Sequence, residues 1–287
     1  MFINLMAGGI GIRDVTLPQT IELAKKHGFA GIDFNIVEAS KLADEHGVAY
    51  VKDLFAKAGV LPGGWGAPVN MRGDAAEFKQ SVADLGKYAD LAVALGSNRA
   101  LGGISPCSDD KNWDEQWAWA IEHYAPVAQT LKEHGCRYGL EFIGPKTIRG
   151  KRKYEFIYSL KDTLKFAKAI GTGNMGVLLD HWHLYTSYGT IDEVRALTNA
   201  DVVAVHVNDA PKGIDVDEQI DNRRLMPLES GVLDIKSFLE ALKSIGFDGP
   251  VTCEPFSARI NAMSADAALA ETAATMRKAF ALAGVVN

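Results

Sequence analysis

The stretch Gly176–His183 reads GVLLDHWH, and it decides both the fold and the place where chemistry is expected. A turn at 171–174 precedes it, and the residues up to Leu179 carry no polar side chain. A short apolar run between turn signals predicts a strand buried on both faces, as in a parallel sheet. The next residues are ionisable: Asp180, His181 and His183. Parallel α/β proteins carry their functional residues at the carboxyl ends of strands, so this stretch predicts a site.

The rest of the chain repeats one unit, in which an amphipathic helix ends at a glycine and an apolar strand follows. Lys26–Gly28, Glu133–Gly135 and Ser244–Gly246 are helix ends of this kind. Glycine suits them because it adopts the left-handed conformation without strain. Strands are predicted at 2–6, 31–35, 60–65, 99–104, 137–142, 176–180, 202–209 and 251–256. Helices are predicted at 16–27, 42–58, 74–95, 113–131, 160–170, 191–197, 235–245 and 265–282.

Eight strand–helix units favour a (β/α)8 TIM barrel, with residues 1–287 forming a single domain. An open, doubly wound sheet is the alternative. Such a sheet would normally have a glycine-rich phosphate turn after its first strand, but Gly8–Gly11 lacks the G-x-G-x-x-G spacing. No linker or low-complexity segment divides the chain. We therefore expect an α/β barrel with its site at one rim.

Composition narrows the class of partner. The net charge of −6 argues against a nucleic-acid-binding surface, which is normally basic. Cys107, Cys136 and Cys253 have no metal-like spacing and indicate reduced thiols in a cytoplasmic protein. Met1–Met6 lacks the basic region of a signal peptide, and no apolar run approaches the ~20 residues of a membrane span. We expect neither a nucleic-acid nor a membrane partner.

Four ionisable residues lie at or near the ends of four successive predicted strands: Glu141, Asp180, His206 and Glu254. In a barrel these strand ends surround one side of the same mouth. Three carboxylates this close would repel one another unless a cation lay among them. Three oxygen donors and one imidazole suit a single divalent ion, with Mn²⁺ expected and Mg²⁺ or Co²⁺ as alternatives. One strand-end carboxylate alone would more often be a helix cap or an ion-pair partner.

These residues carry a resemblance to a family. Glu141, Asp180 with His183 three residues later, His206 in the sequence HVND, and Glu254 resemble the xylose-isomerase-like TIM barrels. The branch that looks closest contains the sugar phosphate isomerases and epimerases, among them tagatose and psicose 3-epimerases and inosose isomerases. The resemblance implies Glu141, Asp180, His206 and Glu254 as metal ligands and His183 as a contact to a substrate oxygen. It also implies a homodimer or homotetramer.

The reaction implied by this resemblance is isomerisation or epimerisation of a small carbohydrate: a keto-sugar, a polyol ketone or a sugar phosphate. The ion would polarise a carbonyl and the adjacent hydroxyl, which acidifies the C–H bond between them and stabilises an enediolate. Glu141 and Glu254 would act as acid and base, one removing the proton and the other returning one. Epimerisation and aldose–ketose isomerisation both remain open at this point.

Three other function classes were weighed against this reading. A lyase or dehydratase on the same scaffold, acting on an inosose or a 3-keto-glycoside, would share the proton abstraction and is the alternative. An abasic-site endonuclease should have more histidine ligands and a basic surface, which this sequence lacks. A non-catalytic sugar-binding or assembly protein is disfavoured because both glutamates are present.

Candidates for the pocket wall come from other strand ends. Trp65, between two glycines at the third strand, could stack on a sugar ring or belong to the core, and Asn35 at the second strand could bind a hydroxyl. Lys212 lies six residues after His206, where the epimerases often carry an arginine. The loop 210–231 exceeds the ~12–15 residues of ordinary connections, so we expect it to cover the mouth or contact a partner subunit. The basic run at 149–153 is read as a solvated loop in preference to a phosphate clamp.

Overall fold

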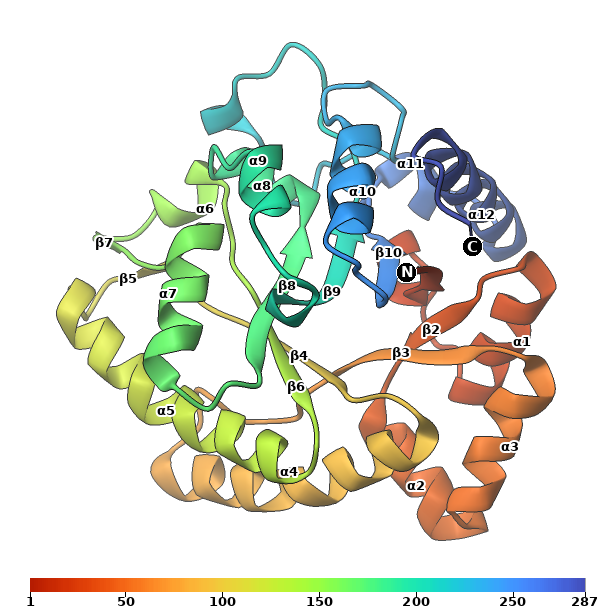
Figure 1. Ribbon diagram of the computed structural model, residues 1–287, viewed down its shortest axis with the longest axis horizontal. Coiled ribbons are helices and arrows are strands. Elements are labelled where there is room, and N and C mark those ends of the chain that lie inside the picture. The colour runs from red at the N-terminus through yellow and green to blue at the C-terminus, as the bar shows by residue number, and fades with distance from the viewer. Residues whose placement is uncertain (287) are drawn as a thin grey trace.

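Eight parallel strands close into a barrel in the computed structural model, which describes residues 1–286 (Figure 1). The strands are β1 (Phe2–Leu5), β2 (Gly31–Phe34), β3 (Leu61–Gly66), β4 (Arg99–Gly103), β6 (Arg137–Glu141), β8 (Met175–Asp180), β9 (Val202–Val207) and β10 (Pro250–Cys253). Their order around the barrel is β1-β10-β9-β8-β6-β4-β3-β2. Each strand therefore pairs with the next barrel strand along the chain, and β1 pairs with both β2 and β10. The predicted TIM barrel is confirmed.

The longer helices surround this barrel, as Figure 1 shows. They are α1 (Leu17–His27), α2 (Ile36–His46), α3 (Val48–Ala58), α4 (Ala75–Leu95), α5 (Trp113–Glu133), α7 (Leu160–Ile170), α10 (Ile235–Ser244) and α12 (Ala265–Leu282). Shorter elements occupy the connections: η1 (Ala7–Ile10), α6 (Lys146–Arg149), α8 (His181–Thr186), α9 (Ile191–Arg195), η2 (Asn199–Asp201), η3 (Val216–Glu218) and α11 (Ala258–Asn261). β5 (Cys107–Ser108) and β7 (Tyr154–Glu155) form a separate antiparallel pair.

The helix boundaries follow from local chemistry. At α1, the Thr16 side chain accepts from the backbone N–H of Gln19, and the Gln19 side chain accepts from the N–H of Thr16. This reciprocal capping box satisfies two backbone donors that a helix start otherwise leaves free. The same helix ends at Gly28, whose φ of 75° is the left-handed conformation predicted for it. Capping and glycine termination together fix how far each helix extends along the barrel.

Two predicted elements are divided differently in the structure. The helical pattern expected over 42–58 is two helices, α2 and α3, because Gly47 at φ 87° breaks the run. The strand β8 ends at Asp180, and α8 begins at His181, so neither His181 nor His183 lies on a strand. The expected loop at Gly8–Gly11 contains the 3-10 turn η1.

The core between the barrel and its helices is apolar, and no helix of the described residues has the length and hydropathy needed to cross a bilayer. The three cysteines are buried and unpaired. Inside the barrel, however, polar side chains are buried as well. Asn4 on β1 is 0% exposed and donates to the hydroxyl of Thr252 on β10 over 2.9 Å. This polar interior becomes important for the cavity described below.

Candidate metal centre

The first two side chains of the centre come from neighbouring strands. Glu141 is the last residue of β6, and Asp180 is the last residue of β8. Asp180 is 0% exposed, and its Oδ1 accepts hydrogen bonds from the backbone N–H of Trp182 at 2.8 Å and from Asn208 Nδ2 at 3.0 Å. Asp180 therefore caps α8 with one oxygen and presents the other to the barrel mouth.

His206 and Glu254 complete the set from the next two strands. His206 on β9 is in register with Asp180 on one side and with Thr252 on the other. Glu254 follows β10 directly, and its backbone N–H donates to the carbonyl of Val207 at 3.0 Å, which extends the strand ladder. Both side chains are buried. Strand register therefore determines the position of all four groups.

The four predicted ligands converge. One candidate ligand atom from each of Glu141, Asp180, His206 and Glu254 can be chosen so that all lie within 4.8 Å of one another. His206 Nδ1 lies 3.4 Å from Glu141 Oε1 and 3.5 Å from Glu254 Oε2. Ligands on opposite sides of a divalent ion, each at about 2.1 Å, would be about 4.2 Å apart. A closure of a few tenths of an ångström would bring the set to that size.

Unsatisfied polar atoms support this fit. Both ring nitrogens of His206 and Oε1 of Glu141 are buried without a hydrogen-bond partner among residues 1–286. Buried polar atoms normally have partners, and a divalent ion would supply one. Burial alone would lower the pKa of His206, but the carboxylates of Glu254 and Glu141 outweigh it and raise that pKa well above its usual value. The centre is thus built to hold additional positive charge.

Arg224, which the sequence did not indicate as a site residue, lies against this centre. It is 2% exposed, and its NH1 donates to Asp180 Oδ2 at 2.7 Å and to Glu254 Oε2 at 2.8 Å. Its NH2 donates to Asp221 Oδ1 at 2.8 Å. Burial would raise the pKa of Asp180, but the charge of Arg224 holds it below the usual value. The loop between β9 and α10 therefore folds over the barrel mouth, as its length suggested.

We expect Arg224→Met to destabilise the metal-free protein by about 3–5 kcal/mol, because the substitution leaves buried carboxylates without their cation. Urea unfolding in the presence of EDTA measures this change. Arg223→Met is the matched control, since Arg223 is exposed and its loss should alter the free energy of unfolding by less than about 0.5 kcal/mol. Saturating Mn²⁺ should reduce the deficit of the Arg224 variant. Equal stability of the two variants would contradict the role given to Arg224.

His183 lies on α8 beside the same carboxylates. Its Nδ1 accepts a hydrogen bond from the backbone N–H of Gly144 at 3.2 Å, and its Nε2 is directed toward the carboxylates and Arg224. That nitrogen lies 3.8 Å from both Asp180 Oδ2 and Asp221 Oδ1 and 3.2 Å from Arg224 NH2. The structure thus places His183 in contact with the centre, 1% exposed and beneath Arg224.

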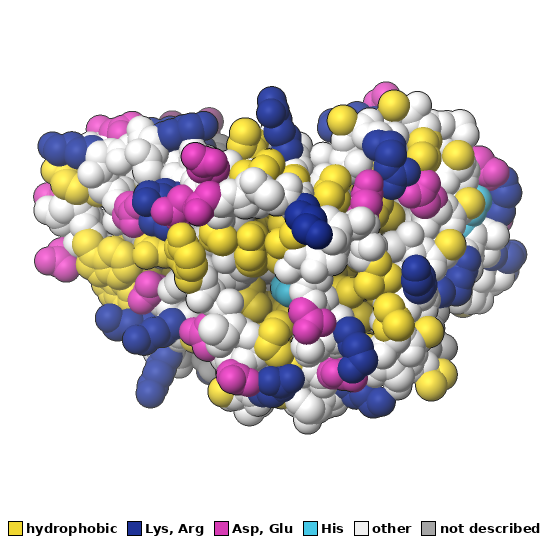
Figure 2. All heavy atoms as spheres, turned by 90° about the horizontal axis from the view of Figure 1, so that it is seen from above, with side chains coloured by type: hydrophobic (Ala, Val, Ile, Leu, Met, Phe, Trp, Pro, Cys, Tyr) yellow, Lys and Arg dark blue, Asp and Glu magenta, His cyan; other side chains and the backbone are white. Residues whose placement is uncertain are grey.

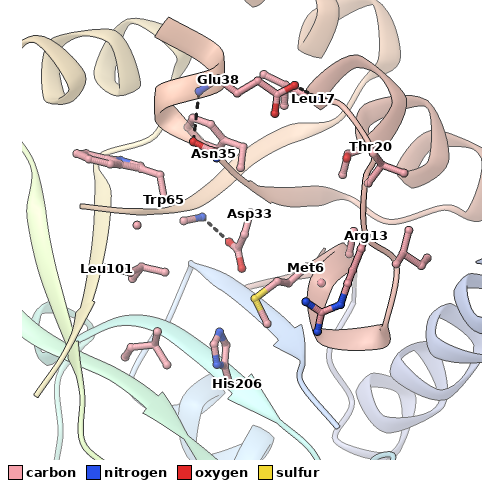
Figure 3. A pocket seen from close by; sticks show the side chains of 18 of the residues that line it. Met6, Arg13, Leu17, Thr20, Asp33, Asn35, Glu38, Trp65, Leu101 and His206 are labelled. Carbon is pink, nitrogen blue, oxygen red and sulfur yellow. Dashed lines mark hydrogen bonds between the residues drawn. The ribbon is translucent and has the colours of Figure 1, made fainter. Parts of the chain in front are cut away.

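A cavity of about 500 Å³ opens beside the centre, between η1 and the ends of the first three strands. Two of the ligands, Glu141 and His206, line it, and so does the 1% exposed Trp65. Figure 3 shows Trp65 and His206 on opposite sides of this space. Seen from above, Figure 2 shows hydrophobic side chains around a histidine near the middle of the face. One side of the cavity is therefore apolar, and another side is formed by residues of the predicted ligand cluster.

The other two sequence-based candidates lie differently. Asn35 lines the cavity, but its Oδ1 accepts from the backbone N–H groups of Val37 and Glu38, so this oxygen caps α2. Lys212 is exposed and does not line the cavity. Asp33, which was not among the predicted site residues, does line the cavity. A carboxylate within the apolar strand GIDF was the available signal.

The model of the family described as xylose isomerase-like TIM barrel matches residues 21–279. The chain belongs to this family. Its match includes all four ligands of the centre, which lie between residues 141 and 254. The membership agrees with the barrel topology.

Individual members of the xylose isomerase-like family are related to the chain at low identity. An inosose isomerase from Bacillus velezensis is 21% identical over 252 residues, 85% of each sequence. The structure of a xylose isomerase domain protein from Alicyclobacillus acidocaldarius is 27% identical, with a TM-score of 0.89 and 99% of both chains covered. The IolI protein, solved with a bound zinc atom, has a TM-score of 0.78 at 17% identity, covering 99% of this chain and 98% of that one. At 17% identity the last likeness shows the fold alone.

Proposed function

We propose that the protein is a divalent-metal-dependent isomerase or epimerase that acts on the carbon next to a ketone in a small carbohydrate. The observation that carries this proposal is the position of Glu141 and His206, which belong to the ligand cluster and also line the cavity. A substrate in the cavity would therefore adjoin the ion. The similarity to an inosose isomerase supports the reaction class, and the zinc of the IolI protein supports a divalent ion.

The three carboxylates and one imidazole would hold the ion, with Mn²⁺ as the proposed species because oxygen ligands predominate. A bound divalent ion would act as a Lewis acid that polarises the substrate carbonyl and stabilises the enediolate. The single guanidinium of Arg224 does not neutralise three carboxylates, so the centre retains negative charge for a cation.

Glu141 is the carboxylate best placed to take the proton. It ends β6 and lines the cavity, and its Oε1 has no hydrogen-bond partner in the described part of the chain. A carboxylate oxygen beside a substrate carbon can act as a general base. The backbone of Glu141 belongs to a strand, so the position of its carboxylate relative to the cavity is well defined. Proton transfer requires such a defined position.

In our proposal Glu254 acts from another side of the ion. It follows β10, whereas Glu141 ends β6, and two strands separate these positions around the barrel. Arg224 holds Glu254 Oε2 at 2.8 Å and so fixes the orientation of this carboxylate. In our proposal one glutamate removes a proton and the other returns one. In the same proposal His183, whose Nε2 lies 3.8 Å from both Asp180 Oδ2 and Asp221 Oδ1, would contact a substrate oxygen.

Hydrogen exchange tests the proposal directly. The Mn²⁺-loaded protein is incubated in D₂O with a panel of ketoses and with inosose, and proton NMR follows loss of the C–H signal next to the carbonyl. We expect deuterium incorporation together with a new epimer or aldose. An enone absorbance in the same samples would instead indicate elimination and favour the lyase reading. No exchange with any ketone would contradict the proposed function.

A further inference from the structure

Asp33 is a carboxylate in the cavity that neither ligates the centre nor caps a helix. It lies on β2, one residue before the strand ends, and lines the same 500 Å³ cavity as Glu141 and His206. Figure 3 shows its side chain directed into the open space, with Trp65 and Met6 to either side. The proton-transfer scheme above assigns Asp33 no role.

Contacts from three strands fix this carboxylate in place. Its Oδ1 accepts from the backbone N–H of Gly64 on β3 at 2.7 Å, and its Oδ2 accepts from the hydroxyl of Thr252 on β10 at 3.3 Å. Thr252 is held in turn by Asn4 on β1 over 2.9 Å. No Lys or Arg within residues 1–286 forms an ion pair with Asp33, and burial raises its pKa. Hydrogen bonds therefore orient the carboxyl group of Asp33, and no Lys or Arg among the described residues pairs with it.

The backbone around it is shaped to admit polar atoms. A Cβ at Gly63 would approach Asn4 Oδ1 to 2.5 Å, and one at Gly64 would approach Asp33 Oδ1 to 3.1 Å. Glycine at both positions lets β3 approach these side chains closely. Asp33 is half-buried and has no ion-pair partner among the described residues, so a carboxylate at this place in a mostly apolar cavity calls for a role that packing does not provide.

We propose that Asp33 selects the substrate by accepting a hydrogen bond from a hydroxyl group remote from the reacting carbons. The ligand class is a neutral polyhydroxylated ketone, and this inference rests on the proposed function of the same cavity. A carboxylate accepts hydroxyl donors but repels phosphate and carboxylate groups. Arg13 is the only Lys or Arg among the described lining residues and is exposed, so an anionic substituent would have to lie outward, toward Arg13.

Calorimetry on the Mn²⁺-loaded protein tests the inference through binding. The ligands are a ketose, its deoxy analogues lacking one remote hydroxyl each, and the corresponding ketose phosphates. We expect the wild-type protein to bind one deoxy analogue about 10- to 100-fold more weakly than the parent, as is typical for loss of a hydrogen bond to a charged group. Asp33→Asn should weaken binding of the parent ketose but leave that of this analogue nearly unchanged. The wild-type protein should bind the ketose phosphates more weakly than the parent ketose. This difference in affinity should be smaller in Asp33→Asn.

Several outcomes would overturn the inference. In the first, Asp33→Asn loses the same factor in affinity for the parent ketose and for every deoxy analogue. In the second, the wild-type protein binds the phosphates more tightly than the ketoses. In the third, the variant loses affinity for Mn²⁺. Asp44→Asn, an exposed change on α2, is the control and should bind like the wild type. The deuterium-exchange assay is separate: a positive binding result without exchange would contradict the proposed reaction alone. No binding of any ketose would contradict both.

Discussion

Replacing Glu141 by glutamine is expected to lower the rate of deuterium exchange by about 10²- to 10⁴-fold, the usual contribution of a general acid or base. Glutamine keeps the shape of the side chain and an oxygen that can ligate an ion, but it cannot take up a proton. The measurement is kcat for exchange in D₂O at saturating Mn²⁺, with the metal content of each sample determined separately.

Glu133→Gln is the matched control for this change. Glu133 is exposed at the end of α5, the helix that leads into β6, and its loss should leave exchange unchanged. Exchange by the Glu141 variant at the wild-type rate, with the ion bound, would contradict the role of Glu141 as base. If the variant has lost its ion, the comparison is repeated at higher Mn²⁺ concentration until occupancy matches that of the wild type.

Removal of the ion should have the second large effect. Treatment with EDTA is expected to abolish exchange, and added Mn²⁺ to restore it. Binding only to the folded state also stabilises it, by about 2.7 kcal/mol at a concentration 100 times Kd. Thermal unfolding with and without Mn²⁺ measures this gain, and His206→Ala should lose most of it because one ligand is missing.

The affinity for Mn²⁺ should also depend on pH in a defined direction. The pKa of His206 is raised in the metal-free protein, so at neutral pH the ring carries a proton that an ion must displace. Affinity should therefore rise as the pH rises, until His206 is neutral before the ion binds. Titrations of Mn²⁺ between pH 6 and 8 test this. An affinity that is independent of pH, or an unfolding temperature that does not respond to Mn²⁺, would contradict a metal site at this cluster.

The barrel and its ligand cluster could be predicted because their signals are local. An apolar run ending in Asp180 identifies a strand and its functional end within a few residues, and the same rule locates Glu141, His206 and Glu254. The closed order of strands then brings these ends together without any further information from the sequence. Gly47 shows where such rules are weakest, because a glycine inside a helical pattern does not say whether the helix continues.

Arg224 and Asp33 could not be predicted because their roles depend on contacts distant in the sequence. Arg224 lies in a loop whose path is set by Asp180 and Glu254, which are 44 and 30 residues away along the chain. In the sequence, Asp33 is one polar residue in a short strand. Its role follows only from the hydrogen bonds that Gly64 and Thr252 donate to it. Lys212 has the spacing from His206 at which the epimerases often carry an arginine, but its side chain is exposed and does not line the cavity, so its contact with a substrate stays a prediction.

The pairing of β1 with β10 bears on how the protein emerges from the ribosome. Phe2 is in register with Pro250, so the second edge of β1, the first strand to be made, stays open until β10, the last strand, has been made. Until then a nascent chain offers an open strand edge, a feature that promotes association with other chains. Slower translation or a lack of chaperones should therefore lower the yield of folded protein, even though the free energy of unfolding of the finished protein is unchanged.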